Sequence, residues 1–231
     1  MALSEFAFFC LLLFSCGETV TVGADERDDI GSNQLTVDQF QPRSSLRLPE
    51  TRPRRAKFPV VDVHVHPRIK LHSNAEQLEE YVRLMDQQNI AVCISLDGQL
   101  GEALEEHKKL LWTHHRDRFV IFANIEWIGA GSKEDPSSWD CHRPDFGRRM
   151  AKALADARSQ GAVGLKVFKT LGLYLRNIDN SLVAIDDARW DPIWRACGEL
   201  GMPVLIHSAD PVAFFQPFDR FNERWEELNR H

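Results

Sequence analysis

The chain has 231 residues, which is enough to bury one sizeable hydrophobic core. Its formal net charge of −6 at pH 7 and its pI near 5.8 give no electrostatic basis for binding nucleic acid. A hydrophobic fraction of 43% is ordinary for a globular protein.

The first apolar segment of the chain is FAFFCLLLF at residues 6–14, which is too short to span a bilayer because a span takes about 20 residues. It is typical of the apolar part of a secretory signal, and Val-Gly-Ala at residues 22–24 suits cleavage after it. We therefore expect residues 1–24 to be a signal peptide and the protein to be exported, to the periplasm or out of the cell. An alternative is a lipoprotein signal that ends at Cys16 and anchors the protein to lipid.

Residues 25–57 open with acidic side chains and then become rich in Pro and Arg. Little of this segment is apolar, so it cannot bury enough surface to offset the entropy lost on ordering. It is predicted to be a disordered tether, although its Arg cluster would also suit contact with an anionic surface. The remaining residues, 58–231, are predicted to form one α/β domain.

The segment FPVVDVHVHP at residues 58–67 is typical of a β-strand, because its valines are β-branched and a proline ends the run. Side chains alternate along a strand, so Asp62, His64 and His66 should share one face. Two imidazoles then point toward one place near the strand's carboxyl end, and neutral imidazole is a common metal ligand. The alternative is an edge strand whose polar face meets water.

From this strand onward, apolar runs typical of strands alternate with segments whose apolar residues recur at helical spacing. Such alternation implies a parallel sheet with right-handed crossovers, and the near-continuous apolar runs indicate strands covered on both faces. The predicted strands are 60–66, 90–96, 119–125, 162–168 and 204–207. The predicted helices are 75–88, with Asn74 as its N-cap, 100–114, 146–159 and 191–200.

The last predicted strand ends in His207, within VLIHSADP. In parallel α/β sheets and barrels, the carboxyl ends of the strands carry the chemistry. Catalytic zinc sites usually have three protein ligands and one open position, and His207 would complete that number with His64 and His66. The alternative is a core or loop histidine that binds no metal. The other histidines at residues 72, 107, 114, 115 and 142 fall on predicted helices or loops and are interpreted as structural or surface residues.

Three motifs together resemble the amidohydrolase superfamily: VVDVHVHP, GAVGLKVFK and VLIHSADP. The similarity is to the amidohydrolase-related branch, which includes the aminocarboxymuconate-semialdehyde decarboxylase-like enzymes. The resemblance implies a metal-dependent (β/α)8 TIM barrel of which about five β/α units, the N-terminal part, are present. We therefore expect a chain truncated after the fifth strand, with an open sheet edge through which it would self-associate. A complete five-stranded open sheet is the alternative.

By this resemblance the chain is a metal-dependent hydrolase of a small molecule with an amide, ester or lactone bond, acting through metal-activated water. The expected cofactor is a divalent metal, with zinc the first choice. The acid–base residues implied by the family, a histidine after the sixth strand and an aspartate after the eighth, would lie beyond His231. Two alternatives are a metal-dependent decarboxylase (a lyase) on the same site, and an inactive fragment or non-catalytic exported binding domain.

Two lysines, Lys166 and Lys169, lie in or just after the fourth predicted strand. Some members of the superfamily use a carbamylated lysine at the end of this strand to bridge two metals, and Lys169 is the candidate here. A substrate-binding lysine and a solvated or ion-paired lysine are the alternatives.

Three carboxylates follow predicted strands at the same end of the sheet. Asp97 precedes a glycine and would either face the substrate or form a turn. Glu126 would either orient the substrate or be a solvated loop residue. Asp210, three residues after His207, would either fix the orientation of that ring or begin a turn.

Overall fold

The computed structural model describes residues 35–44, 46, 48–49, 51–71 and 74–230. The predicted signal peptide, with Cys16, lies outside these residues. No helix in the described part of the chain is long and apolar enough to cross a membrane. The chain divides into two compact units, residues 48–210 and a second unit made of residues 1–47 and 211–231.

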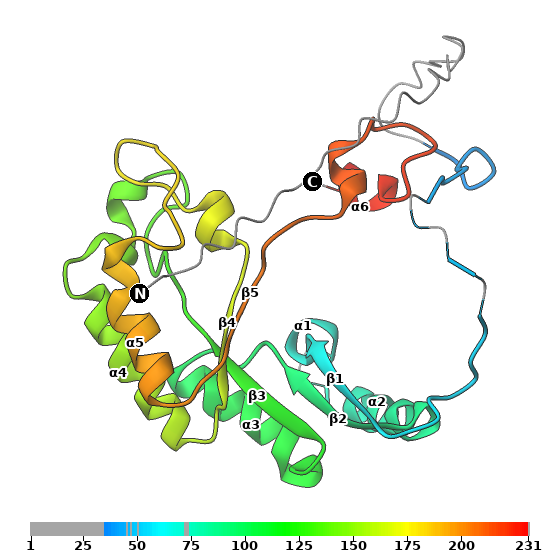
Figure 1. Cartoon of the computed structure of the whole chain (residues 1–231), viewed down its shortest axis with the longest axis horizontal. Helices are drawn as coiled ribbons and strands as arrows, with labels where there is room; N and C mark the ends of the chain where they lie inside the picture. The colour runs from blue at the N-terminus through cyan, green and yellow to red at the C-terminus, as the bar shows by residue number, and fades with distance from the viewer. Residues whose placement is uncertain (1–34, 45, 47, 50, 72–73, 231) are drawn as a thin grey trace, which may run out of the picture. The chain divides into compact units, whose positions relative to one another are not determined.

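The larger unit contains five parallel strands that are neighbours in the same order as they occur along the chain (Figure 1). The strands are β1 (Val60–Val65), β2 (Ile90–Ser95), β3 (Phe119–Asn124), β4 (Gly164–Val167) and β5 (Val204–Ile206). Consecutive parallel strands joined by helical crossovers are the arrangement of the first five units of a (β/α)8 barrel. The predicted α/β fold class is confirmed.

The sheet is strongly curled. The rings of His66 and Phe168, which follow β1 and β4, have centroids only 5.8 Å apart. In a flat sheet these two strands would be separated by about 14 Å, because neighbouring strands lie about 4.8 Å apart. The curl therefore brings the carboxyl ends of strands that are not neighbours toward one another.

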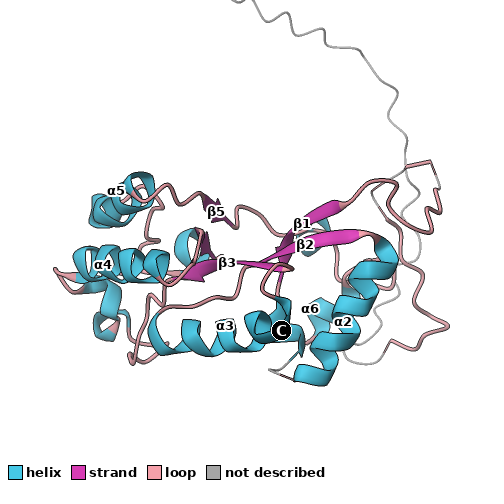
Figure 2. Cartoon of the chain, turned by 90° about the horizontal axis from the view of Figure 1, so that it is seen from below, coloured by secondary structure: helices cyan, strands magenta, loops and turns pink. Residues whose placement is uncertain are grey.

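The crossover helices are α2 (Ala75–Gln88), α3 (Gly101–His115), α4 (Phe146–Ser159) and α5 (Asp191–Glu199). Figure 2 shows α2 and α3 on the same side of the sheet, where α2 contacts β2 and α3 contacts β3. Helix α2 begins as predicted, since the side chain of Asn74 accepts a hydrogen bond from the backbone N–H of Gln77 at 3.1 Å. It ends at Asn89, which takes up a left-handed conformation with φ 63°.

One short helix, α1 (Pro67–Leu71), was not predicted. Pro67 ends β1, as expected, but it also occupies the first position of this helix, where the missing N–H of proline costs nothing. The helix follows directly after His66, so it fixes the direction in which the chain leaves the strand.

The core is formed by the inner sides of the helices and by the central strands. All four residues of β4 are buried, and Trp190 and Leu165 are fully enclosed. In β1, by contrast, Val61 and Val63 are 54% and 59% exposed. The expectation that the strands are covered on both faces is therefore wrong for β1, because β1 is at the end of the sheet and pairs in the described structure with β2 alone.

The turn after β2 depends on a glycine. The backbone N–H of Gly98 donates to the carbonyl of Phe122 in β3 at 3.0 Å. A Cβ atom at this position would overlap that same carbonyl oxygen. Only glycine allows the chain to run this close to β3, and this approach places the preceding residue, Asp97, at the carboxyl end of the sheet.

In the second unit, part of the predicted tether pairs with the end of the chain. The backbone N–H groups of Gln41 and Arg43 donate to the carbonyls of Arg220 and Phe221, at 3.0 and 2.8 Å. The guanidinium of Arg43 also lies 3.8 Å from the centre of the Phe221 ring. This unit contains helix α6 (Trp225–Asn229). The division into a tether at 25–57 and a barrel domain at 58–231 stays a prediction.

Candidate functional site

The candidate site lies at the carboxyl ends of the strands of the larger unit. His66 directly follows β1, Asp97 follows β2, Lys166 is in β4, and His207 directly follows β5. The backbone of His207 continues the sheet, since its N–H donates to the carbonyl of Val167 at 3.0 Å. The topology therefore brings together residues that are more than 140 positions apart in the sequence, at the end of the sheet where barrel enzymes carry their chemistry.

His66 is held by a buried carboxylate. Its Nδ1 lies 2.7 Å from Oδ1 of Asp97, whose residue is 2% exposed. The other carboxylate oxygen of Asp97 accepts a hydrogen bond from the backbone N–H of Arg68 at 3.1 Å. With its proton on Nδ1, the imidazole presents an unprotonated Nε2, which is the form that binds a metal. Asp97 therefore orients His66 and is more than a turn residue.

His64 lies beside His66, with ring centroids 5.2 Å apart in an edge-on arrangement. His64 is an exposed residue, but the limited burial of its ring lowers its pKa, and the positive charge of Lys166 lowers it further, with smaller contributions from His66 and His207, while the charge of Asp62 acts in the opposite direction. The lowered pKa favours the neutral imidazole, which is the ligand form.

His207 has a buried ring nitrogen in need of a partner. Its Nε2 makes no hydrogen bond with any residue described in the structure. The nearest carboxylate oxygen is Oδ1 of Asp210, at 3.6 Å, which is beyond hydrogen-bond distance. Asp210 instead bonds to the Nζ of Lys169 at 3.1 Å. Asp210 is thus close to His207 but bonds to Lys169, and its predicted role in fixing the orientation of the His207 ring stays a prediction.

The three predicted ligands are not close enough together in the structure to coordinate one metal ion. Within residues 35–230, apart from the few positions not described, no group of three or more His, Cys, Asp or Glu side chains is close enough to hold a metal ion. His64, His66 and His207 share one end of the sheet. Their binding of a metal stays a prediction.

Lys169 is an ion-paired lysine. Its hydrogen bond to Asp210 raises the pKa of its amine, and a hydrogen bond with Tyr174 acts in the same direction. Carbamylation requires a neutral amine, so this environment does not favour the bridging role considered for Lys169. Glu126 is exposed, and its carboxylate accepts a hydrogen bond from the backbone N–H of Ile128 at 3.2 Å, within its own loop.

Lys166 is a deeply buried residue at this end of the sheet. This residue is 2% exposed, and it is among the largest fully buried side chains of the larger unit. The available signal was a lysine inside an otherwise apolar strand, GLKVF, where a charged side chain is rarely buried unless it has a partner.

A buried polar pair supports Asp97 from the side of α3. The hydroxyl of Ser95 lies 2.7 Å from Nε2 of His107, and both residues are buried. The backbone N–H of Asp97 is 3.5 Å from the same hydroxyl. Burial lowers the pKa of His107 to about 4, and the positive charge of Arg68 acts in the same direction. His107 is therefore neutral and structural, in agreement with its interpretation from the sequence.

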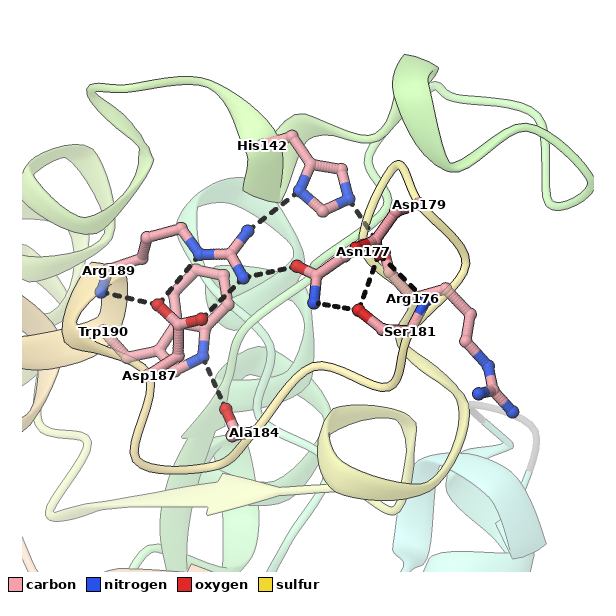
Figure 3. Close-up of polar contacts among 9 residues, drawn as sticks. All are labelled: His142, Arg176, Asn177, Asp179, Ser181, Ala184, Asp187, Arg189 and Trp190. Atoms are coloured by element: carbon pink, nitrogen blue, oxygen red, sulfur yellow. Dashed lines mark hydrogen bonds and ion pairs between the residues drawn. The ribbon is translucent and has the colours of Figure 1, made fainter.

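The loops after β3 and β4 are tied to each other by Arg189 (Figure 3). Its guanidinium donates to the carboxylate of Asp187 at 2.7 and 2.9 Å, to Oδ1 of Asn177 at 2.6 Å and to Nδ1 of His142 at 3.1 Å. Because arginine can only donate, Nδ1 of His142 accepts, and its Nε2 donates to the carbonyl of Arg176 at 2.9 Å. These contacts fix two of the loops that border the site.

The sequence matches no family model and no curated protein. A search of solved structures finds similarity to the crystal structure of a probable 2-pyrone-4,6-dicarboxylic acid hydrolase from Acinetobacter baumannii with citric acid bound. The sequences are 14% identical, and the TM-score is 0.38. The match covers 64% of this chain and 49% of that one, so this chain spans about half the length of the structure that it matches.

Proposed function

We propose that the chain carries the metal-binding part of a metal-dependent hydrolase of the amidohydrolase type, which acts on a small molecule with an amide, ester or lactone bond. The observation that carries this proposal is the pairing of His66 with the buried carboxylate of Asp97 at the carboxyl end of a curled parallel sheet. A carboxylate that holds the far nitrogen of a histidine is the usual support of a metal-bound imidazole.

The chemistry of the donor set fits zinc. His64, His66 and His207 offer three imidazole nitrogens, and Nε2 of His207 is a buried atom without a hydrogen-bond partner among the described residues. An unsatisfied buried nitrogen costs free energy unless something binds it. Because the rings do not form a ready group of three, binding would have to draw them together.

When bound by such ligands, zinc makes water available as a nucleophile at neutral pH and polarises a carbonyl group. The chain's own residues have separate tasks. Asp97 keeps the proton of His66 on Nδ1 and so keeps Nε2 free. The influences that lower the pKa of His64 keep that ring neutral. The contacts of Arg189 hold the bordering loops in place.

The test is hydrolysis of 4-nitrophenyl acetate by the chain, first freed of metal and then supplied with zinc. An activated ester is chosen because its leaving group departs without a proton, so the assay depends on the nucleophile. We expect zinc-dependent turnover that His66→Ala lowers by about 100-fold or more. Loss of a group that only supports a metal ligand costs about 10- to 100-fold in affinity or activity, and loss of the ligand itself should cost at least as much.

The matched control is His114→Ala, which removes an exposed histidine on α3 and should keep the zinc-dependent rate. Turnover that is the same with and without zinc, or the same in His66→Ala as in the wild type, would contradict the proposed function.

A further inference from the structure

We infer that Lys166 is an anion-binding residue whose ammonium group holds a negatively charged oxygen of the substrate. This inference rests on the proposed function only in placing the active site at the carboxyl end of the sheet.

Lys166 is buried without a partner of opposite charge. The residue is 2% exposed, and its amine makes no hydrogen bond or ion pair with any residue in the described structure. Its Nζ lies over the face of the Phe168 ring, 5.6 Å from the ring centre. Buried charges in proteins are as a rule paired, because the loss of hydration must be compensated.

Two carboxylates at this end of the sheet have partners other than Lys166. Asp97 is bonded to His66 and to the backbone of Arg68, and Asp210 is bonded to Lys169. The positive charge of Lys166 acts on His64, whose pKa it lowers. Burial also lowers the pKa of Lys166 itself. An anion bound here would compensate a charge that this part of the protein leaves uncompensated.

Lys169 provides an internal comparison. It lies three residues farther along the chain, its side chain is 38% exposed, and it has both Asp210 and Tyr174 as partners. Of these two lysines near the end of β4, Lys169 therefore has a carboxylate as its partner, whereas Lys166 has no partner of opposite charge among the described residues.

The ligand chemistry is a negatively charged oxygen, for which an ammonium group is a compact charge with up to three donors. Such an oxygen has two sources in ester or amide hydrolysis. It is either a carboxylate that the substrate carries away from the scissile bond, or the oxyanion that forms at the attacked carbonyl.

The first experiment needs no metal and no turnover. Thermal unfolding of the metal-free chain is measured in sodium acetate and, at equal ionic strength, in sodium chloride. Acetate should raise the Tm of the wild type and of Lys169→Met, and it should leave the Tm of Lys166→Met unchanged. Lys166→Met should also unfold at a higher temperature than the wild type in chloride, because it no longer buries an uncompensated charge.

Lys166→Arg keeps the charge and should keep the acetate response. It serves as the second variant in case Lys166→Met folds poorly. Equal acetate responses of Lys166→Met and the wild type would overturn the inference. So would an Arg variant that behaves like the Met variant.

The second experiment separates the two sources of the oxygen. Zinc-dependent hydrolysis is compared for 4-nitrophenyl acetate and for the 4-nitrophenyl half-ester of succinate, which carries a carboxylate. If Lys166 binds the substrate carboxylate, Lys166→Met should raise KM for the succinate ester alone, by roughly 10- to 100-fold. If it binds the oxyanion, kcat should fall by roughly 10²- to 10³-fold for both esters.

Unchanged constants for both esters would overturn the inference. An acetate response without any zinc-dependent turnover would leave the anion site standing and reject the proposed function, so the two failures are distinguishable.

Discussion

The free energy of unfolding should fall by about 3 kcal/mol between pH 6.5 and pH 4 through His107 alone, since each pH unit over which one proton is taken up contributes about 1.4 kcal/mol. In the folded protein, burial lowers the pKa of His107 from 6.5 to about 4. Between these values the unfolded chain binds a proton that the folded chain refuses. Acidification therefore favours the unfolded state. The stability that the neutral His107 contributes is fully present above pH 6.5 and is lost as the pH falls toward 4.

Chemical denaturation at a series of pH values checks this expectation. His107→Gln keeps a polar partner for Ser95 and does not titrate, so its stability should decline less steeply over the same range. His114→Gln, at an exposed position of the same helix, is the control and should follow the wild type. If His107→Gln and the wild type lose stability in parallel between pH 6.5 and 4, the burial of His107 has no such effect.

Replacing Asp97 with Asn should weaken zinc binding by about 10- to 100-fold, which is the usual cost of losing the carboxylate behind a metal-bound histidine. The substitution conserves size but removes a negative charge. In the wild type, Oδ1 of Asp97 lies 2.7 Å from Nδ1 of His66 and keeps the proton on that nitrogen. Competition titration with a chromophoric chelator measures the affinity. Glu126→Gln removes an exposed carboxylate at the end of β3 and should bind zinc as the wild type does.

Equal zinc affinity of Asp97→Asn and the wild type would show that the contact between His66 and Asp97 is only structural. A loss of affinity in Glu126→Gln of the same size would instead point to a general effect of net charge.

The regular elements of the larger unit could be predicted from the sequence to within one or two residues. Helices α2 and α4 have the predicted bounds, because their apolar residues recur at helical spacing and turn residues flank them. Helix α1 could not be predicted in the same way, since five residues hold too little periodicity. The exposure of Val61 and Val63 could not be predicted from the sequence either, because it depends on which strands are neighbours in space.

The relative position of two site residues on the same strand could be predicted from the sequence. Contacts between site residues on different strands could not. The spacing of His64 and His66 gave their shared position directly, and their rings are 5.2 Å apart. The partner of His66 lies 31 residues away in the sequence, and the choice between a turn and a buried contact for Asp97 required the register of β1 and β2. The two lysines near the end of β4 differ in burial and partners, which their sequence positions do not reveal.

The proposed metal site requires that His64, His66 and His207 bind one ion together. X-ray absorption spectroscopy of the chain loaded with one equivalent of zinc measures this coordination. We expect three imidazole nitrogens at about 2.0–2.1 Å from the zinc in the wild type, and two in His207→Ala. A zinc ion surrounded mainly by oxygen, or a spectrum that His207→Ala leaves unchanged, would show that the three histidines do not form the site.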